Sequence, residues 1–159
     1  MRIPKIYLET TLFNFYFDED RGFAHDSTVK LFKEIAAGKF TAYTSTVVME
    51  ELAKAPLEKY EKMSYLRQQY DITVLTLTDE ADRLADVYVA EGIIPQRYRT
   101  DGLHIALATA NDLDIIISMN FQHIVKRKTI LATGKINNLN GYHAIEIYSP
   151  MEVVENENN

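Results

Sequence analysis

The stretch RTDGLHIALATANDLDIIISMN, residues 99–120, decides the fold. Its first half repeats apolar residues at the spacing of one helix face. Its second half holds the apolar run 115–117, which is typical of a strand buried on both faces of a parallel sheet. The predicted helix begins at a carboxylate, Asp101, and the predicted strand is followed by an amide, Asn120. Packing explains the apolar middle of this stretch but not its polar ends.

The rest of the chain alternates in the same way. Apolar runs predict strands at 5–8, 40–45, 72–77, 114–118 and 143–150, and helical patterns occupy 28–38, 46–55, 57–70, 79–92 and the segment from 101. Asp26 or Ser27 is the expected N-cap of the helix at 28–38. A loop followed by a helix is expected within 121–130. This order predicts an α/β fold, a three-layer α/β/α sandwich with a central parallel sheet.

Length and composition indicate a single domain of an ordinary soluble protein. The 159 residues are 47% hydrophobic and 25% charged, and they include no cysteine, which excludes disulfides and thiolate metal sites. We expect one domain over residues 1–153 and a flexible acidic tail over 154–159. The N-terminus meets Glu9 too early for a secretory signal, and no apolar run is long enough to span a membrane, so we expect a cytoplasmic protein without membrane contact.

The net charge of −6 argues against a protein whose whole surface binds nucleic acid. Two basic clusters nevertheless flank the segment from Asp101 to Asn120: Arg97 and Arg99 precede it, and Lys126, Arg127 and Lys128 follow it. Such clusters can hold a phosphate backbone, although they can equally solvate loops. Two neighbouring aromatic residues can stack on bases or pack in the core; they are Tyr98 and Phe121.

Acidic residues converge on one edge of the predicted sheet. Glu9 and Asn120 each follow a predicted strand, so both belong at the edge formed by the strand carboxyl ends, where open α/β sheets place their sites. Glu51 leans toward the apolar stripe of its helix, and Asp101 starts a helix. Each has an alternative interpretation: Asp101 as an N-cap, and Glu51 as a helix cap or a partner of an arginine.

Three carboxylates in one place repel each other, and a hard divalent cation removes that cost. Oxygen ligands without cysteine suit Mg²⁺ or Mn²⁺, so Glu9, Glu51 and Asp101 are the predicted metal ligands, with Asn120 placing water or metal. A second layer of polar groups is expected to orient these acids; its members are Thr10, Thr11, Ser118 and His104. For His104 the alternative is a hydrogen-bonded structural histidine. Neither G-x-G-x-x-G nor a P-loop occurs, which disfavours other phosphate-binding enzymes.

The sequence resembles the PIN domain family. The matching stretches are KIYLETTLFNFYF (5–17), YTSTVVMEELAK (43–54), TDGLHIALATANDLDIIISMNFQHIV (100–125) and EIYSPMEV (146–153). They span nearly the whole chain, and the third is the most specific. The resemblance implies a compact α/β/α fold with a parallel sheet, and Mg²⁺- or Mn²⁺-dependent endoribonuclease activity. It also implies a toxin of the VapBC toxin–antitoxin type, with RNA as substrate, an antitoxin as partner, and a homodimer.

By position, Glu9, Glu51 and Asp101 match the first three acids of this family. Asn120 and His123 fall where a fourth acid often stands, which adds His123 to the second layer. Two departures follow from this comparison: Glu9 is one methylene longer than the usual Asp, and the fourth acid is missing. The second departure predicts weaker metal binding, because an amide brings no charge to offset the cation. The alternative function is therefore a non-catalytic PIN-like module that binds RNA or a protein.

Overall fold

The protein is described here by a computed structural model that defines residues 2–155. In chain order the elements are β1 (Lys5–Leu8), α1 (Thr10–Phe17), the 3₁₀ turn η1 (Glu19–Arg21), α2 (Phe23–Ala36), β2 (Thr41–Ser45), α3 (Thr46–Leu52), α4 (Leu57–Gln69), β3 (Thr73–Leu75), α5 (Asp79–Ala90), the 3₁₀ turn η2 (Gln96–Tyr98), α6 (Arg99–Ala110), β4 (Ile115–Ile117), α7 (Arg127–Leu139), β5 (Glu146–Tyr148) and α8 (Pro150–Val153).

The strands form one five-stranded parallel sheet in the order β3-β2-β1-β4-β5. β1 lies at its centre and pairs with β2 on one side and with β4 on the other. Tyr7 is in register with Tyr43 of β2 and with Ile116 of β4. The strand order reverses around β1, and ligand sites of open parallel sheets form at such a reversal.

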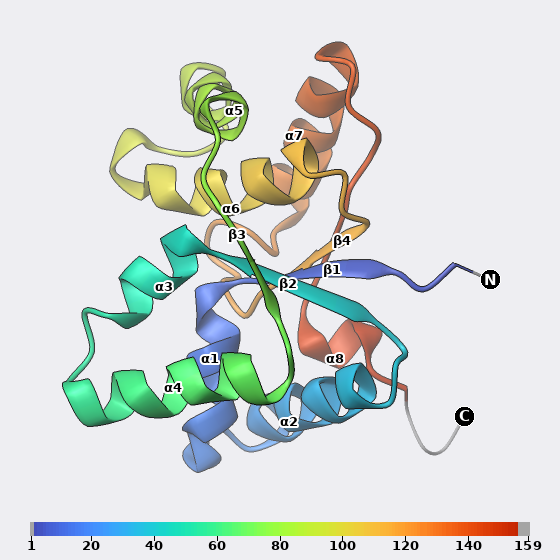
Figure 1. Cartoon of the computed structure of the whole chain (residues 1–159). Helices are drawn as coiled ribbons and strands as arrows, with labels where there is room; N and C mark the ends of the chain where they lie inside the picture. The colour runs from blue at the N-terminus through green and yellow to red at the C-terminus, as the bar shows by residue number, and fades with distance from the viewer. Residues whose placement is uncertain (1, 156–159) are drawn as a thin grey trace.

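Helices cover both faces of the sheet, as the sequence predicts (Figure 1). The helices α5, α6 and α7 lie on one face, and α1, α2, α4 and α8 lie on the other (Figure 1). Parallel strands require crossover connections, and those connections place helices on both faces. The predicted three-layer α/β/α sandwich is confirmed.

The core is built mainly from the two central strands and the helices that pack on them. Ile6, Tyr7 and Leu8 of β1 have no exposed surface, and neither do Ile116 and Ile117 of β4. These runs are apolar on both sides because both faces of the sheet are covered. Tyr7 is the polar exception in the middle of this core, and its hydroxyl therefore needs hydrogen-bond partners.

Several predicted boundaries are wrong, for local reasons. Helix α2 begins at Phe23 after Gly22, so Asp26 and Ser27 lie inside the helix and do not cap it. Helix α7 extends to Leu139, well past the segment predicted as helical. The last strand is shorter than predicted, because Ser149 makes a capping box with Glu152 that starts α8.

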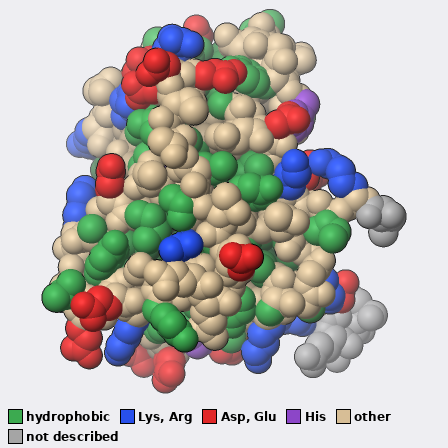
Figure 2. Space-filling model, in the orientation of Figure 1, with side chains coloured by type: hydrophobic (Ala, Val, Ile, Leu, Met, Phe, Trp, Pro, Cys, Tyr) green, Lys and Arg blue, Asp and Glu red, His purple; other side chains and the backbone are tan. Residues whose placement is uncertain are grey.

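Beyond the core, the surface is mixed in character. Apolar side chains are scattered among polar and charged ones on the face shown in Figure 2. None of the helices within residues 2–155 has the length and apolar character needed to span a membrane. Of the predicted flexible tail, Val154 and Glu155 are described: the backbone N–H of Glu155 donates to Glu34 at 3.1 Å, and the side chain of Glu155 pairs with Lys39. Residues 156–159 of that tail lie outside the described part of the chain.

Candidate functional site

The polar residues singled out from the sequence gather at the carboxyl edge of the sheet. Glu9 directly follows β1, and Ser118 directly follows β4. The backbone N–H of Glu9 donates to the carbonyl of Ile117 at 3.1 Å, so the two strand ends are tied together. Ser45 ends the neighbouring strand β2 and caps α3, the helix that carries Glu51. The parallel sheet thus brings distant segments to one edge.

Glu9 is buried, with 3% of its surface exposed, and one of its carboxylate oxygens is fully engaged. Its Oε1 accepts hydrogen bonds from the Thr11 hydroxyl at 2.6 Å, from the Ser118 hydroxyl at 2.6 Å and from the Thr11 backbone N–H at 3.2 Å. The two hydroxyls in turn accept backbone N–H groups of Met119 and Asn120. Since a backbone N–H can only donate, both hydroxyl protons are left to point at Glu9. Within residues 2–155, its Oε2 has no hydrogen-bond partner.

Asp101 lies in the first turn of α6, but it does not cap the helix. Tyr98 occupies the N-cap position, and no side chain makes a cap hydrogen bond there. Burial raises the pKa of Asp101 above its usual value, and the negative charge of Glu9 raises it further. The positive potential of His104 and His123 and a hydrogen bond from Asn120 oppose this rise without cancelling it. The two acids are therefore close enough for the charge of one to resist ionisation of the other.

Glu51 is held by a histidine and a hydroxyl. Its Oε1 accepts from His104 Nε2 at 2.6 Å and from the Thr10 hydroxyl at 2.7 Å. Burial would raise the pKa of Glu51, but the hydrogen bond and charge of His104, with the Thr10 hydroxyl, outweigh it and leave that pKa below its usual value. For His104, burial lowers the pKa, but the hydrogen bond that it donates to Glu51 and the charges of Glu9, Glu51 and Asp101 raise that pKa overall. Among residues 2–155, neither an arginine nor a helix end is a hydrogen-bond partner of Glu51, so both alternatives for Glu51 are wrong.

Sequence reasoning missed two residues of this arrangement, Tyr7 and Ser45. The Tyr7 hydroxyl lies 2.7 Å from His104 Nδ1 and 2.7 Å from the Ser45 hydroxyl, and all three side chains are completely buried. A tyrosine between two apolar strand residues, Ile6 and Leu8, was the available signal for Tyr7. For Ser45, the signal was its place before a helix, where it accepts the Val48 N–H at 3.1 Å.

Asn120 and His123 form a turn beside Asp101. The Asn120 side-chain oxygen accepts a hydrogen bond from the His123 backbone N–H at 3.0 Å. The amide nitrogen of Asn120 is therefore the group left to donate a hydrogen bond to Asp101. The His123 ring stacks on Tyr98 with centroids 4.1 Å apart. Its Nε2 is buried and has no hydrogen-bond partner among the described residues. The turn therefore supplies an amide donor and an imidazole in place of a fourth carboxylate.

The two basic clusters differ in how free their charges are. Lys126, Arg127 and Lys128 are exposed at the start of α7. Arg99 instead pairs with Asp82 and with Asp86, each at 2.8 Å, so α5 already holds its charge. Arg97 is exposed, and its guanidinium lies 5.0 Å from the centroid of the Tyr98 ring. Phe121, with 49% of its surface exposed, is the more accessible of the two predicted stacking aromatics, because Tyr98 is already covered by His123 and Arg97.

The donor set at this edge fits a hydrated divalent cation better than a fully protein-ligated one. The negative charges of Glu9 and Asp101 repel each other, and a bound cation would relieve this repulsion. Glu51 is bound to His104, and across residues 2–155 no three Asp, Glu or His side chains are grouped closely enough to hold a metal ion. This differs from the expected cluster of three carboxylates. Mg²⁺ is commonly held by one or two carboxylates and keeps several waters, so Glu9 and Asp101 fit it as a donor pair.

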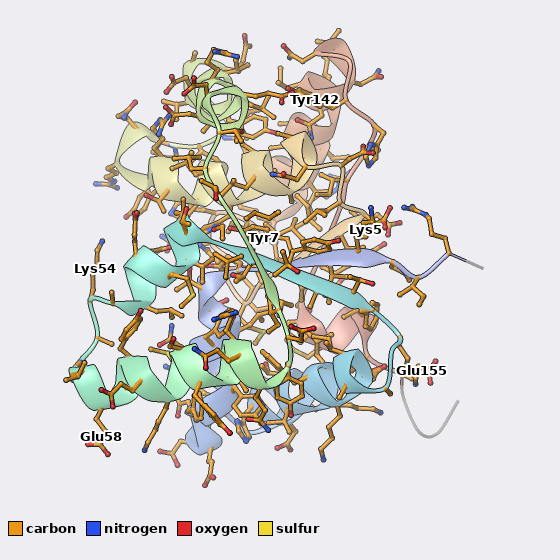
Figure 3. All side chains as sticks on the ribbon, in the orientation of Figure 1. Lys5, Tyr7, Lys54, Glu58, Tyr142 and Glu155 are labelled. Carbon is orange, nitrogen blue, oxygen red and sulfur yellow. The ribbon has the colours of Figure 1, made fainter. Side chains whose placement is uncertain are left out.

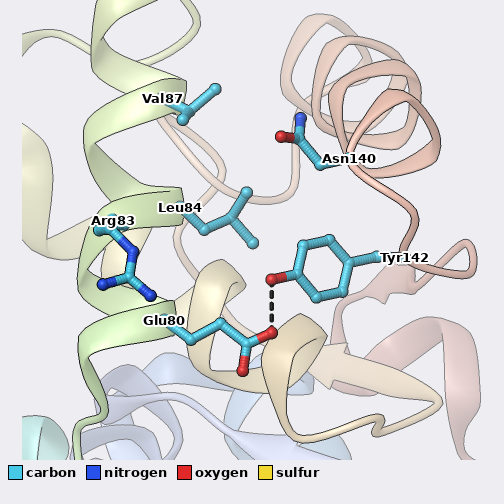
Figure 4. A pocket seen from close by; sticks show the side chains of 6 residues that line it. All are labelled: Glu80, Arg83, Leu84, Val87, Asn140 and Tyr142. Carbon is cyan, nitrogen blue, oxygen red and sulfur yellow. Dashed lines mark hydrogen bonds between the residues drawn. The ribbon is translucent and has the colours of Figure 1, made fainter.

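A separate hollow of about 510 Å³ lies between α5 and the segment after α7 (Figure 4). It is lined by Glu80, Arg83, Leu84, Val87, Asn140 and Tyr142. The Tyr142 hydroxyl donates to Glu80 at 2.6 Å across this hollow (Figure 4). None of the residues predicted from the sequence to form the site lines it, and its only acid is already bonded. The sheet edge, where the predicted acids lie, is therefore the candidate site.

Comparison with known proteins bears on the fold. No protein-family model matches the sequence, and no curated protein matches it. Among solved structures, the chain is similar to one in the crystal structure of VapBC2 from Rickettsia felis bound to a DNA fragment from their promoter. The TM-score is 0.59 at 13% sequence identity, and the match covers 91% of this chain and 98% of that one. A likeness at this identity establishes the fold, and it confirms the PIN-like architecture expected from the sequence.

Proposed function

We propose that this protein is a metal-dependent endoribonuclease that hydrolyses phosphodiester bonds of RNA. The observation that carries the proposal is the pairing of Glu9 with Asp101. These acids are 92 positions apart in the chain, yet burial and the charge of Glu9 both raise the pKa of Asp101 at the carboxyl edge of a PIN-like sheet. Perturbed carboxylates in such a place are candidates for chemistry rather than for packing.

In this proposal Glu9 and Asp101 hold Mg²⁺ or Mn²⁺. A bound ion of this kind supplies a nucleophile by acidifying water, and it polarises the phosphate. The chain contributes orientation: Thr11 and Ser118 fix Oε1 of Glu9, which leaves Oε2 for the site. Glu51 stays ionised because its pKa is lowered, so it accepts hydrogen bonds from water beside the reacting phosphate rather than acting as a strong base.

Substrate RNA would lie across the start of α7. The exposed side chains of Lys126, Arg127 and Lys128 supply positive charge for the phosphate backbone, and Arg97 adds to it from η2. Phe121, exposed directly after Asn120, offers a face for an unpaired base. Because base stacking needs an unstacked nucleotide, this arrangement favours single-stranded or loop RNA over a duplex.

A cleavage assay tests this function. Purified protein is incubated with single-stranded RNA in Mn²⁺ or Mg²⁺, with and without a chelator. We expect cleavage that requires the metal, that is lost in Asp101→Asn, and that persists in the matched control Asp79→Asn, which alters an exposed acid in the first turn of α5. Equal cleavage by Asp101→Asn and the wild type would identify a contaminating nuclease and overturn the proposal.

A second function has its own support. The lack of three grouped acids within residues 2–155 and the binding of Glu51 to His104 favour a PIN-like module that binds RNA without cutting it. Metal-independent RNA binding that is unchanged in Asp101→Asn, with no cleavage in either metal, would establish this alternative in place of the nuclease.

The likeness to VapBC2 motivates a further part of the proposal, that the protein acts as the toxin of a VapBC-type pair and forms a homodimer. Induced expression is expected to arrest growth, and Asp101→Asn is expected to relieve the arrest. Co-expression of a small antitoxin encoded beside the gene should also relieve it and should co-purify with the protein. Growth unaffected by the wild-type protein would contradict the toxin role while leaving the cleavage assay to judge the nuclease.

A further inference from the structure

A buried chain of hydrogen bonds connects the centre of the sheet to Glu51. It runs from the Val48 backbone N–H to the Ser45 hydroxyl at 3.1 Å, then to the Tyr7 hydroxyl at 2.7 Å, and then to His104 Nδ1 at 2.7 Å. On the far side of the imidazole ring, His104 Nε2 reaches Glu51 at 2.6 Å. Figure 3 shows Tyr7 in the middle of the molecule, between the helical layers.

The backbone end of this chain determines its direction. The Val48 N–H can only donate, so the Ser45 hydroxyl accepts from it and has its own proton left for Tyr7. The Tyr7 hydroxyl accepts from Ser45 and therefore donates to His104 Nδ1. A bare Nδ1 leaves the ring proton on Nε2, which donates to Glu51. In this arrangement every polar atom of the chain has a partner, as buried groups require.

The same logic governs Glu9, where two backbone N–H groups orient two hydroxyls toward one carboxylate oxygen. In both acids one oxygen accepts two or more hydrogen bonds, and the other oxygen has no hydrogen-bond partner among the described residues. The two acids differ in how many elements hold them. Glu9 is held directly by residues of its own turn and of the segment after β4, whereas Glu51 is held through a chain of residues from β2, β1 and α6.

We propose that Ser45, Tyr7 and His104 are positioning residues, which fix the Glu51 carboxylate by holding His104 in the Nε2–H tautomer. The inference deepens the proposed function and rests on it for its consequence in catalysis. None of the three touches substrate: each is fully buried, whereas the Glu51 side chain is 31% exposed. Outer hydrogen-bond partners of this kind determine how well an acid is aimed.

The first test reads the tautomer and needs no nuclease activity. Long-range ¹H–¹⁵N correlation spectra of the imidazole rings are recorded at alkaline pH, where His104 is neutral. We expect a protonated Nε2 and a bare, hydrogen-bonded Nδ1 in the wild type, and a shifted Nδ1 resonance with a mixture of tautomers in Tyr7→Phe. A wild-type spectrum with the proton on Nδ1, or an Nδ1 resonance unchanged in Tyr7→Phe, would overturn the assignment.

The second test separates positioning from general stability. Tyr88→Phe is the matched control, because Tyr88 is another fully buried tyrosine whose hydroxyl bonds to Asn137, away from the acids. We expect Tyr7→Phe to lower kcat about tenfold to a hundredfold at an unchanged KM, and Tyr88→Phe to leave both constants near wild type. Equal kcat values for Tyr7→Phe and Tyr88→Phe would refute the positioning role.

A pair of substitutions at His104 extends this test if Tyr7→Phe folds poorly. The amide nitrogen of His104→Gln reaches about as far as Nε2, so it can still donate to Glu51, while that of His104→Asn reaches only the Nδ1 position. We expect cleavage to be retained better in His104→Gln than in His104→Asn. The reverse order would contradict the proposal. Absence of cleavage in the wild type would refute the nuclease function and leave the tautomer to be judged by its spectrum.

Discussion

Replacing Asp101 with asparagine is expected to abolish cleavage and, at the same time, to stabilise the fold. The carboxylate is half-buried, and burial together with the charge of Glu9 raises its pKa. A raised pKa in an acid means that the ionised form is less favourable in the folded protein than in the unfolded chain. Asparagine keeps the size and removes the charge, so it removes that penalty.

The size of the stabilisation expected for Asp101→Asn depends on the favourable and unfavourable interactions of the Asp101 charge. The N-terminus of α6 favours a negative charge by about 0.3–1 kcal/mol, and asparagine forfeits this gain. The pKa of Asp101 is raised, so burial and the charge of Glu9 together outweigh the opposing effects of His104, His123 and Asn120. A net stabilisation of about 1 kcal/mol is reasonable for relief of one poorly compensated buried polar group. In a chain of 159 residues this corresponds to a rise in Tm of roughly 2–4 °C.

The pH dependence identifies the cause. An acid with a raised folded pKa contributes stability that is fully present below its unfolded pKa, about 3.9, and that is lost as the pH rises through the folded pKa. The advantage of Asp101→Asn over the wild type should therefore be absent near pH 3, grow as the pH rises through the folded pKa, and be constant above it.

Urea denaturation followed by circular dichroism at a series of pH values measures this difference. Asp79→Asn serves as the control, because Asp79 is exposed in the first turn of α5. Its substitution removes only the favourable interaction of the charge with the helix N-terminus. We expect Asp79→Asn to be neutral or slightly destabilised at pH 7. A destabilised Asp101→Asn, or an advantage independent of pH, would show that Asp101 serves the helix rather than a site, and would refute the reasoning.

Further predictions concern the support of the site, the RNA surface and the core. Ser118→Ala removes a donor to Glu9 and should weaken Mn²⁺ binding about tenfold to a hundredfold by calorimetry, whereas unchanged affinity would exclude Glu9 as a ligand. Alanine at residues 126–128 should weaken RNA binding and reduce the salt dependence by about 0.7 per lost phosphate contact, as measured by fluorescence anisotropy. Arg99→Ala should leave RNA affinity unchanged and cost about 1 kcal/mol or less in urea denaturation, because its charge is held by α5. Ile116→Ala should cost about 2–5 kcal/mol, and a smaller loss would place β4 outside the core.

The parallel sheet and the edge that carries the acids could be predicted from local patterns. The apolar run 115–117 indicated a strand covered on both faces, and that strand is β4. Glu9 follows β1 and Ser118 follows β4, and strand polarity alone places both at the same edge. Such features depend on residues near each other in the chain, where periodicity and turn chemistry act.

The pairings at that edge depended on tertiary structure. Tyr7 and His104 are 97 positions apart, and Glu51 and His104 are 53 apart, so no local pattern relates them. The register of β1 against β2 and the packing of α6 on the sheet decide which hydroxyl meets which ring. The same holds for Arg99, whose charge is held by α5 only because α5 and α6 pack together.

The sequence by itself therefore determined the order of strands and helices and the kind of side chain at each strand end, because periodicity and strand direction are properties of the chain. Only the folded structure decided which of those side chains bond to one another, because hydrogen bonds act over about 3 Å and depend on how separate elements pack. That is why the acids were predicted while Tyr7 and Ser45, which connect Glu51 to the core, were not.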